Sequence, residues 1–260
     1  MQEAPIHYNT ISQVASLIEA KELSPVELTE AMLARIDAVD GRYLSYATVM
    51  ADQAMESARA AETAISAGNY LGPLHGVPIA VKDLCFTNGV RTMGGSKVLR
   101  DHVPDFDATV VKNLLAAGAV ILGKLNLTEG AMAGYNPEFQ IPLNPWNTGR
   151  WSGASSSGSG VATAAGLCFG SLGSDTGGSI RFPAAACGTV GIKPTWGRVS
   201  RYGVIPVSWT LDTMGWLVRT VEDAALTMNV IAGYDPKDVA SAQVDIPDYT
   251  SALTNDVRGL

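Results

Sequence analysis

The chain has 260 residues, of which 47% are hydrophobic and only 17% are charged, so it can bury one large core or two small ones and is not disordered. Its net charge of −7, without a run of Lys or Arg, excludes the basic surface typical of proteins that bind nucleic acid or anionic membranes. We therefore expect a small-molecule partner.

The cysteines and the N-terminal sequence bear on cofactors and location. Cys85, Cys168 and Cys187 lie far apart without CxxC spacing, which favours neither a disulfide framework nor a zinc site. We therefore expect no metal and no other cofactor. The first ten residues lack a basic segment followed by an apolar core, and a run of about 18 apolar residues, as a membrane span needs, occurs nowhere. These features predict a cytoplasmic protein without a membrane partner.

The first third of the chain is predicted to be helical, because apolar residues recur there at helical spacing. Ser24 and Glu27 predict a capping box at the start of the second helix. We interpret residues 1–70 as a helical segment that packs on a core formed by residues 71–260. The three predicted helices cover 11–20, 25–39 and 51–66.

After Gly72 the sequence changes to short apolar runs that alternate with helical segments. Alternation of this kind predicts an α/β protein, in which helices cover a sheet. The predicted elements are a strand over 77–81, a helix over 108–117, a strand over 119–123, further alternating segments over 158–165, 167–172 and 190–193, and a last helix over 221–232.

Two glycine-rich clusters, over 153–160 and 173–183, are dense in small hydroxyl residues. A flexible linker is the simplest explanation, but the apolar segment 161–172 lies between the clusters and an ordered apolar segment follows them. Small residues within a packed region indicate that the backbone approaches something closely. A phosphate-binding loop is disfavoured, because neither GxxxxGK followed by Ser or Thr nor GxGxxG occurs.

Glycine-rich loops also suit an oxyanion hole, because consecutive backbone N–H groups can turn toward one developing negative charge. Thr176, Gly177 and Gly178 can supply such donors, and Ser179 at the end of the run is a candidate nucleophile. The chain has only three histidines and no GxSxG motif, which disfavours a Ser-His-Asp triad. Lysine remains as a base, and Lys82, which follows an apolar run, is the lysine best placed for burial and a lowered pKa.

These segments resemble the defining motifs of the amidase signature family, whose members hydrolyse amides with a Ser–cis-Ser–Lys triad. The resemblance implies a mixed, twisted β-sheet covered by helices, of which this chain holds only the N-terminal part. It covers nearly the whole chain and rests on residues 76–83, 123–126, 144–146, 153–160, 173–183 and 188–198.

By position, the resemblance implies Lys82 as base, Ser155 as bridging serine and Ser179 as nucleophile. It also implies oxyanion donors on Thr176 to Ser179 and a cis peptide between Ala154 and Ser155. In the mechanism that this implies, neutral Lys82 takes a proton from Ser155, which takes one from Ser179 as Ser179 attacks.

Other residues in the motifs have more than one interpretation. Asp175 and Arg181 either bind a charged substrate group, to which Arg is suited, or form a structural ion pair that supports the loop. We interpret Ser156 and Ser157 as caps of the helix near residue 158, outside the catalytic set. Cys187 is expected to be a small core residue.

The resemblance implies an amidase that acts on a small amide, anilide or carbamate. An alternative is the A-type amidase subunit of a tRNA-dependent glutaminyl or asparaginyl amidotransferase, which residues 197–203 also resemble, although Phe182 stands where that subunit usually has glutamine. A second alternative is an inactive binding homologue, which the presence of all three triad residues disfavours. The expected partners are a small amide substrate, the C-terminal part of the fold and a second copy in a homodimer, but not nucleic acid directly.

Overall fold

The structure, a computed structural model, describes residues 5–132, 134–254, 256 and 258. Its centre is a mixed sheet of six strands in the order β1-β3-β2-β4-β6-β5. β2 lies parallel to β3 and β4, whereas the outer pairs β1–β3, β4–β6 and β5–β6 are antiparallel. The predicted mixed α/β fold is therefore confirmed. The strands are β1 (Tyr46–Val49), β2 (Pro78–Lys82), β3 (Val120–Leu125), β4 (Ser171–Asp175), β5 (Val190–Ile192) and β6 (Thr213–Val218).

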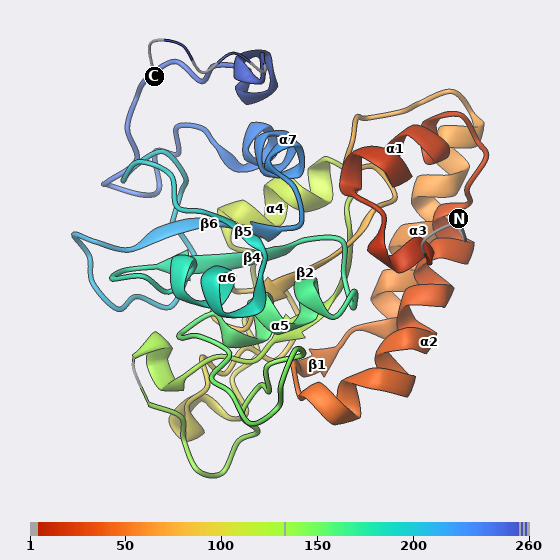
Figure 1. Cartoon of the computed structure of the whole chain (residues 1–260). Coiled ribbons are helices and arrows are strands. Elements are labelled where there is room, and N and C mark those ends of the chain that lie inside the picture. The colour runs from red at the N-terminus through yellow and green to blue at the C-terminus, as the bar shows by residue number, and fades with distance from the viewer. Residues whose placement is uncertain (1–4, 133, 255, 257, 259–260) are drawn as a thin grey trace.

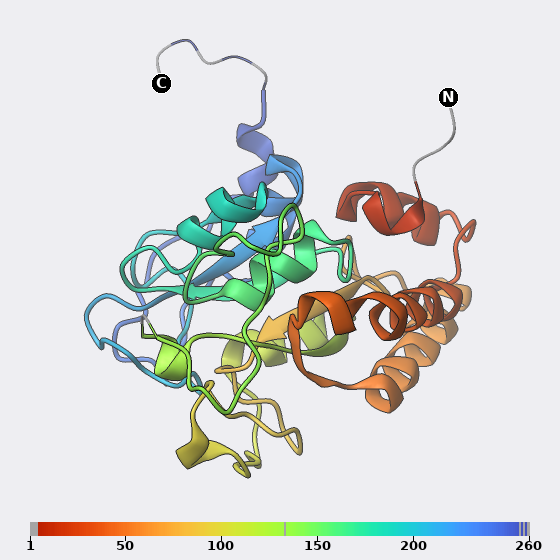
Figure 2. The ribbon, with the colours of Figure 1, turned by 60° about the horizontal axis from the view of Figure 1, so that its bottom comes forward.

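Helices cover both faces of this sheet. Figure 1 shows α4 and α7 over one face and α5 and α6 over the other. Figures 1 and 2 both show α1, α2 and α3 together at one side of the molecule, where α2 and α3 pack on each other and α3 packs on β3. The helices are α1 (Ile11–Glu19), α2 (Pro25–Tyr43), α3 (Ala51–Ser66), α4 (Thr109–Ala116), α5 (Ser157–Ala164), α6 (Arg181–Cys187) and α7 (Val221–Ile231).

The central strands are buried along their whole length, because helices shield both faces. Every residue of β2, β3, β4 and β6 is buried, which explains the continuous apolar runs in most of them. The parallel strands β2 and β4 are neighbours, so their carboxyl ends lie at one edge of the sheet. Lys82 ends β2 and Asp175 ends β4, and this edge is where binding sites of open α/β sheets form.

Most predicted elements form close to their expected bounds. The helices predicted over 11–20, 51–66 and 221–232 appear as α1, α3 and α7, and each end agrees within one residue. β4 begins only at Ser171, inside the segment predicted over 167–172. β1, α6 and β6 were not predicted.

The capping box predicted at Ser24 and Glu27 is wrong in part. The Ser24 hydroxyl oxygen accepts hydrogen bonds from the N–H groups of Val26 and Glu27, so Ser24 does cap α2. The box is incomplete because, within the described residues, the Glu27 side chain accepts no bond from the Ser24 N–H, while the Ser24 hydroxyl group donates to Glu62 on α3. The reciprocal box occurs at the start of α1, between Thr10 and Gln13.

The division of the chain at residue 70 remains a prediction, but the segment before it is not all helical. β1 lies within this segment and extends the sheet, with Tyr46 opposite Leu125 and Val49 opposite Gly123. None of the helices in the described part of the chain has the length and apolar content that crossing a membrane requires.

Candidate active site

Lys82 lies at the centre of the candidate site, and its side chain is fully buried. Its Nζ lies 2.7 Å from Ser155 Oγ and 2.8 Å from both Ser156 Oγ and Ser174 Oγ. Three elements build this cluster: β2 ends at Lys82, Ser155 and Ser156 precede α5, and Ser174 lies on β4. The structure thus brings the predicted pair Lys82 and Ser155 together and adds two hydroxyl groups.

Burial changes the proton affinity of this amine. It lowers the pKa of Lys82 to about 7, because an ammonium group is poorly solvated away from water. The carboxylates of Asp175 and Asp212 act in the opposite direction and offset part of the effect. Around neutral pH a large fraction of Lys82 is therefore uncharged and able to accept a proton.

The hydrogen bonds of Ser156 fix its role. Its Oγ donates to the Ser174 carbonyl oxygen at 3.1 Å, and a hydroxyl group has only one hydrogen to donate. Ser156 must therefore accept from Lys82, and it also accepts from the Ser174 N–H at 3.3 Å. The prediction that Ser156 caps α5 is wrong, because its side chain makes no capping bond at the start of that helix.

Sequence reasoning missed Ser174. The available signal was its place at the end of a strand beside β2, where a hydroxyl group can face the residue that ends β2. That signal depends on the pairing of β2 with β4, which motifs do not contain. Ser174 and Ser156 each accept a hydrogen bond from the Lys82 amine.

The segments that carry Ser155 and Ser179 lie side by side. The Ser156 N–H donates to the Ser179 carbonyl oxygen at 3.2 Å, and the peptide bond between Ala154 and Ser155 is cis, as the resemblance implies. Ser155 is buried, whereas Ser179 is half-buried and so remains accessible to a small molecule. The approach is close because Gly153 has a φ of +85°, and a Cβ there would lie 2.3 Å from Pro183 Cα.

Asp175 organises the loop between β4 and α6. Its carboxylate accepts from the N–H groups of Gly178 at 2.8 Å and Ile180 at 3.1 Å, and it pairs with the guanidinium of Arg181 at 2.9 Å. Burial raises the pKa of Asp175, but the bonds from Arg181 and the backbone outweigh this and hold the pKa below its usual value. Of the two open interpretations, the structure shows the supporting ion pair.

The same bonds correct the predicted set of oxyanion donors. Gly178 has already donated its N–H to Asp175, so this group is engaged within the protein. Within the described part of the chain, the N–H groups of Thr176, Gly177 and Ser179 have no acceptor. Gly177 is exposed, and Thr176 and Ser179 are half-buried, so these three N–H groups are left for a ligand.

Asp212, which sequence reasoning also missed, ties the loop to a neighbouring segment. Its carboxylate accepts from Thr176 Oγ1 at 2.5 Å and from the N–H groups of Val207 and Ser208 at 2.8 and 2.9 Å. Asp212 directly precedes β6, whose Thr213 lies opposite Asp175 of β4. This pairing, rather than any motif, brings Asp212 to Thr176.

The sequence profile of the Amidase family matches residues 27–260. The chain belongs to this family. A relative from Mycobacterium tuberculosis, the candidate amidase AmiD, is 52% identical over 253 residues, which are 97% of this chain and 53% of that protein. The A-type subunit of the glutamyl-tRNA(Gln) amidotransferase from Chloroflexus aggregans is 51% identical over 257 residues, with coverage of 98% and 53%.

Solved structures agree with this assignment to the amidase family. The native peptide amidase from Stenotrophomonas maltophilia superposes with a TM-score of 0.89 at 37% identity, over 95% of this chain and 53% of that one. The chain therefore spans about half the length of the curated relatives it matches.

Proposed function

We propose that the protein is an amidase that hydrolyses carboxylic amide C–N bonds through an acyl-enzyme on Ser179, without a cofactor. The observation that carries this proposal is the buried Lys82 amine, 2.7 Å from Ser155, beside a loop that presents a half-buried Ser179. A base with a pKa of about 7 and an accessible hydroxyl group are what amide cleavage by a serine requires. Membership of the amidase family supports the same chemistry.

The proposed steps use these groups in turn. Ser179 Oγ attacks the amide carbon, Ser155 takes its proton, and Ser155 passes its own proton to neutral Lys82. The carbonyl oxygen becomes negative and is stabilised by free N–H groups of the loop, those of Thr176, Gly177 and Ser179. The C–N bond then breaks as the proton returns through Ser155 to the leaving amine. Water attacks the Ser179 ester, loses a proton to the same relay and releases the carboxylic acid.

We further infer that the substrate is a small amide and that the protein works in the cytoplasm. The cysteines support a reducing compartment, because Cys85, Cys168 and Cys187 are all free and buried. The homodimer and the contribution of a C-terminal part of the fold remain predictions.

A second candidate is the A-type subunit of a tRNA-dependent amidotransferase, because a relative of that name is 51% identical. Purification with partner subunits and release of ammonia from glutamine would favour it over a stand-alone amidase. An inactive homologue is a weaker candidate, because Lys82 and Ser155 remain in hydrogen-bond contact.

A fluorophosphonate that reacts with activated serines tests the assignment of Ser179. We expect one adduct on Ser179 in the full-length natural protein and none in Ser179→Ala, as located by peptide mass spectrometry. Ser96→Ala, which removes a half-buried hydroxyl group outside the site, is the matched control and should label normally. Unchanged labelling of Ser179→Ala would refute the assignment.

A further inference from the structure

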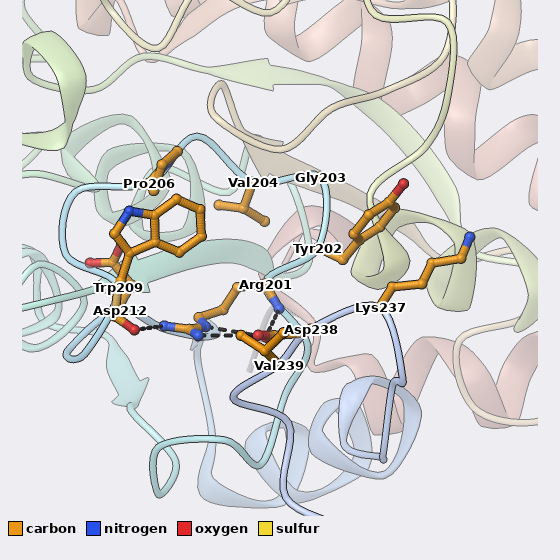
Figure 3. Close-up of a pocket in the computed structure, with 10 residues that line it drawn as sticks. All are labelled: Arg201, Tyr202, Gly203, Val204, Pro206, Trp209, Asp212, Lys237, Asp238 and Val239. Carbon is orange, nitrogen blue, oxygen red and sulfur yellow. Dashed lines mark hydrogen bonds and ion pairs between the residues drawn. The ribbon is translucent and has the colours of Figure 1, made fainter.

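A groove with a volume of about 260 Å³ borders the candidate active site at Asp212, which lines it and also bonds to Thr176. In Figure 3 the indole of Trp209 lies at one end of the groove, and Tyr202 with Lys237 lies at the other. Arg201 and Asp238 lie between these ends and bond to each other. Nothing in the proposed steps of amide cleavage uses these residues, so the groove needs its own explanation.

The groove is joined to the active site at two points. On one side, the Ile205 N–H donates to the Leu84 carbonyl oxygen at 3.0 Å and the Phe86 N–H donates to the Gly203 carbonyl oxygen at 2.8 Å. Leu84 and Phe86 belong to the segment that directly follows Lys82. On the other side, Asp212 lines the groove, and its carboxylate holds the hydroxyl group of Thr176 in the loop before Ser179.

Most polar groups of the groove are already paired within the protein, and the Lys237 ammonium group lies over the Tyr202 ring, 5.0 Å from its centroid. Arg201 donates through Nε and Nη2 to Asp238 and through Nη1 to the Trp209 carbonyl oxygen. Asp212 accepts three hydrogen bonds. What remains for a ligand is mainly apolar: the Trp209 side chain is 73% exposed and the Val239 side chain is 98% exposed. Such a lining favours a flat, apolar group over a charged one.

The size of the groove limits the group it can take. A cavity of about 150 Å³ accommodates benzene, so the volume here is enough for one aromatic ring and a few more heavy atoms. A ring can lie on the Trp209 indole in an offset stack, which is a favourable arrangement for aromatic pairs.

We propose that this groove binds an aromatic ring of the amide substrate, stacked on Trp209, while the amide group lies at Ser179. The proposal rests on the proposed amidase function and narrows its substrates to amides that carry a ring. The ring belongs either to the acyl part or to the amine part of the substrate, and the chemistry of recognition is the same for both.

Binding without turnover tests this proposal. Calorimetric titration of the full-length Ser179→Ala protein with phenylacetamide, acetanilide and acetamide compares a ring on the acyl side, a ring on the amine side and no ring. We expect at least one ring-bearing amide to bind about tenfold or more tightly than acetamide, which corresponds to burial of a ring on an aromatic partner. The tighter of the two ring-bearing amides identifies the side of the substrate that enters the groove.

Variants of tryptophan then assign the binding to the groove. In the Ser179→Ala background, Trp209→Ala should weaken binding of the ring-bearing amide about tenfold, whereas Trp209→Phe, which keeps a ring, should largely retain it. Trp151→Ala is the matched control, because Trp151 is 59% exposed and lies near the site, against Phe182, but outside the groove.

Three results would overturn the proposal: no preference for a ring, unchanged binding in Trp209→Ala, or a loss in Trp151→Ala instead. Fluorophosphonate labelling of Ser179 in the Trp209→Ala protein distinguishes failure of the groove proposal from failure of the proposed amidase function. Labelling should persist there, because Trp209 takes no part in the proton relay.

Discussion

Lys82 combines complete burial with three hydroxyl neighbours, and its protonation state should control activity. Because the uncharged amine is the active form in the proposed relay, the rate should rise with pH through about 7. Lys82→Met keeps the length of the side chain but removes the base, and we expect kcat to fall by about 10²- to 10⁴-fold. A pH–rate profile without a rising limb near 7 would contradict the assignment of the base.

The same residue makes stability depend on pH. An unfolded lysine has a pKa near 10.4, so between about pH 7 and 10 the unfolded chain holds a proton that folded Lys82 lacks. Stability should therefore rise with pH across this window, by roughly 1 kcal/mol per pH unit. Urea unfolding of wild type and Lys82→Met at two pH values in this window should show that the substitution removes this slope.

Asp212 is expected to act on the reaction through Thr176. Asp212→Asn removes a negative charge that raises the pKa of Lys82, so the rising limb of the pH–rate profile should move to lower pH. It also weakens the bond that holds Thr176, and kcat should fall. Because the two residues share one bond, the losses in Asp212→Asn and Thr176→Val should not add in the double variant.

The control for this pair is Asp245→Asn, which alters an exposed carboxylate elsewhere on the surface. It should change neither the rising limb of the pH–rate profile nor kcat. Strict additivity of the two losses would show that Asp212 does not work through Thr176.

At the scale of elements, a second buried lysine joins β3 to the segment after β2. Lys124 Nζ lies 3.7 Å from Asp83 Oδ1 and donates to the Cys85 carbonyl oxygen and to Thr92 Oγ1. Both charged side chains are almost fully buried. Burial raises the pKa of Asp83 to about 6, and Lys124 is the main influence that keeps it from rising further.

Lys124→Met should destabilise the fold, because it leaves the buried Asp83 carboxylate without its charged partner and with only the hydrogen bond from the Met93 N–H. We expect a loss of about 3 kcal/mol in the free energy of unfolding, limited by protonation of Asp83, and partial recovery in the double variant with Asp83→Asn. Denaturant unfolding measures both. Lys97→Met, which breaks an exposed ion pair with Glu138, should cost less than about 1 kcal/mol. Equal losses in the two lysine variants would contradict the argument.

Sequence patterns predicted long helices well but missed short elements whose form depends on their neighbours. β1 is a four-residue edge strand with one buried residue, so it has little pattern of its own. β6 is interrupted by Gly215, where a Cβ would lie 2.1 Å from the Ile192 carbonyl oxygen. Its identity as a strand depends on pairing with β4 and β5, which are distant in sequence. α6 begins at the end of the glycine-rich cluster and extends four residues beyond it.

At the scale of the whole molecule, the candidate site shows the same limit of prediction from sequence patterns. The contact between Lys82 and Ser155 could be predicted because each residue lies in a motif that carries its signal locally, whereas the role of Ser179 stays a prediction. Ser174 and Asp212 could not, because they reach the site through the packing of β4 against β2 and β6. Coordinates are also needed to know which backbone N–H groups are already bonded, as the Gly178 N–H is to Asp175.

The packed core also predicts how the cysteines react. Cys85, Cys168 and Cys187 are buried, and burial raises the pKa of each thiol to about 12, so little reactive thiolate exists at neutral pH. A chromogenic disulfide reagent should find no fast-reacting thiol in the folded chain and three after addition of guanidinium. Rapid reaction while the circular dichroism spectrum is unchanged would contradict this.

The sequence has three consecutive serines at positions 155 to 157, which suggests that one could replace another. Ser156 donates its only hydroxyl hydrogen to the Ser174 carbonyl oxygen, so it has no hydrogen to donate in place of Ser155. The site therefore contains several serine hydroxyl groups, but Ser156 cannot substitute for Ser155. In the proposed relay, loss of the oxygen atom at position 155 would therefore break the route for hydrogen between Ser179 and the Lys82 amine, and the neighbouring Ser156 would not restore it.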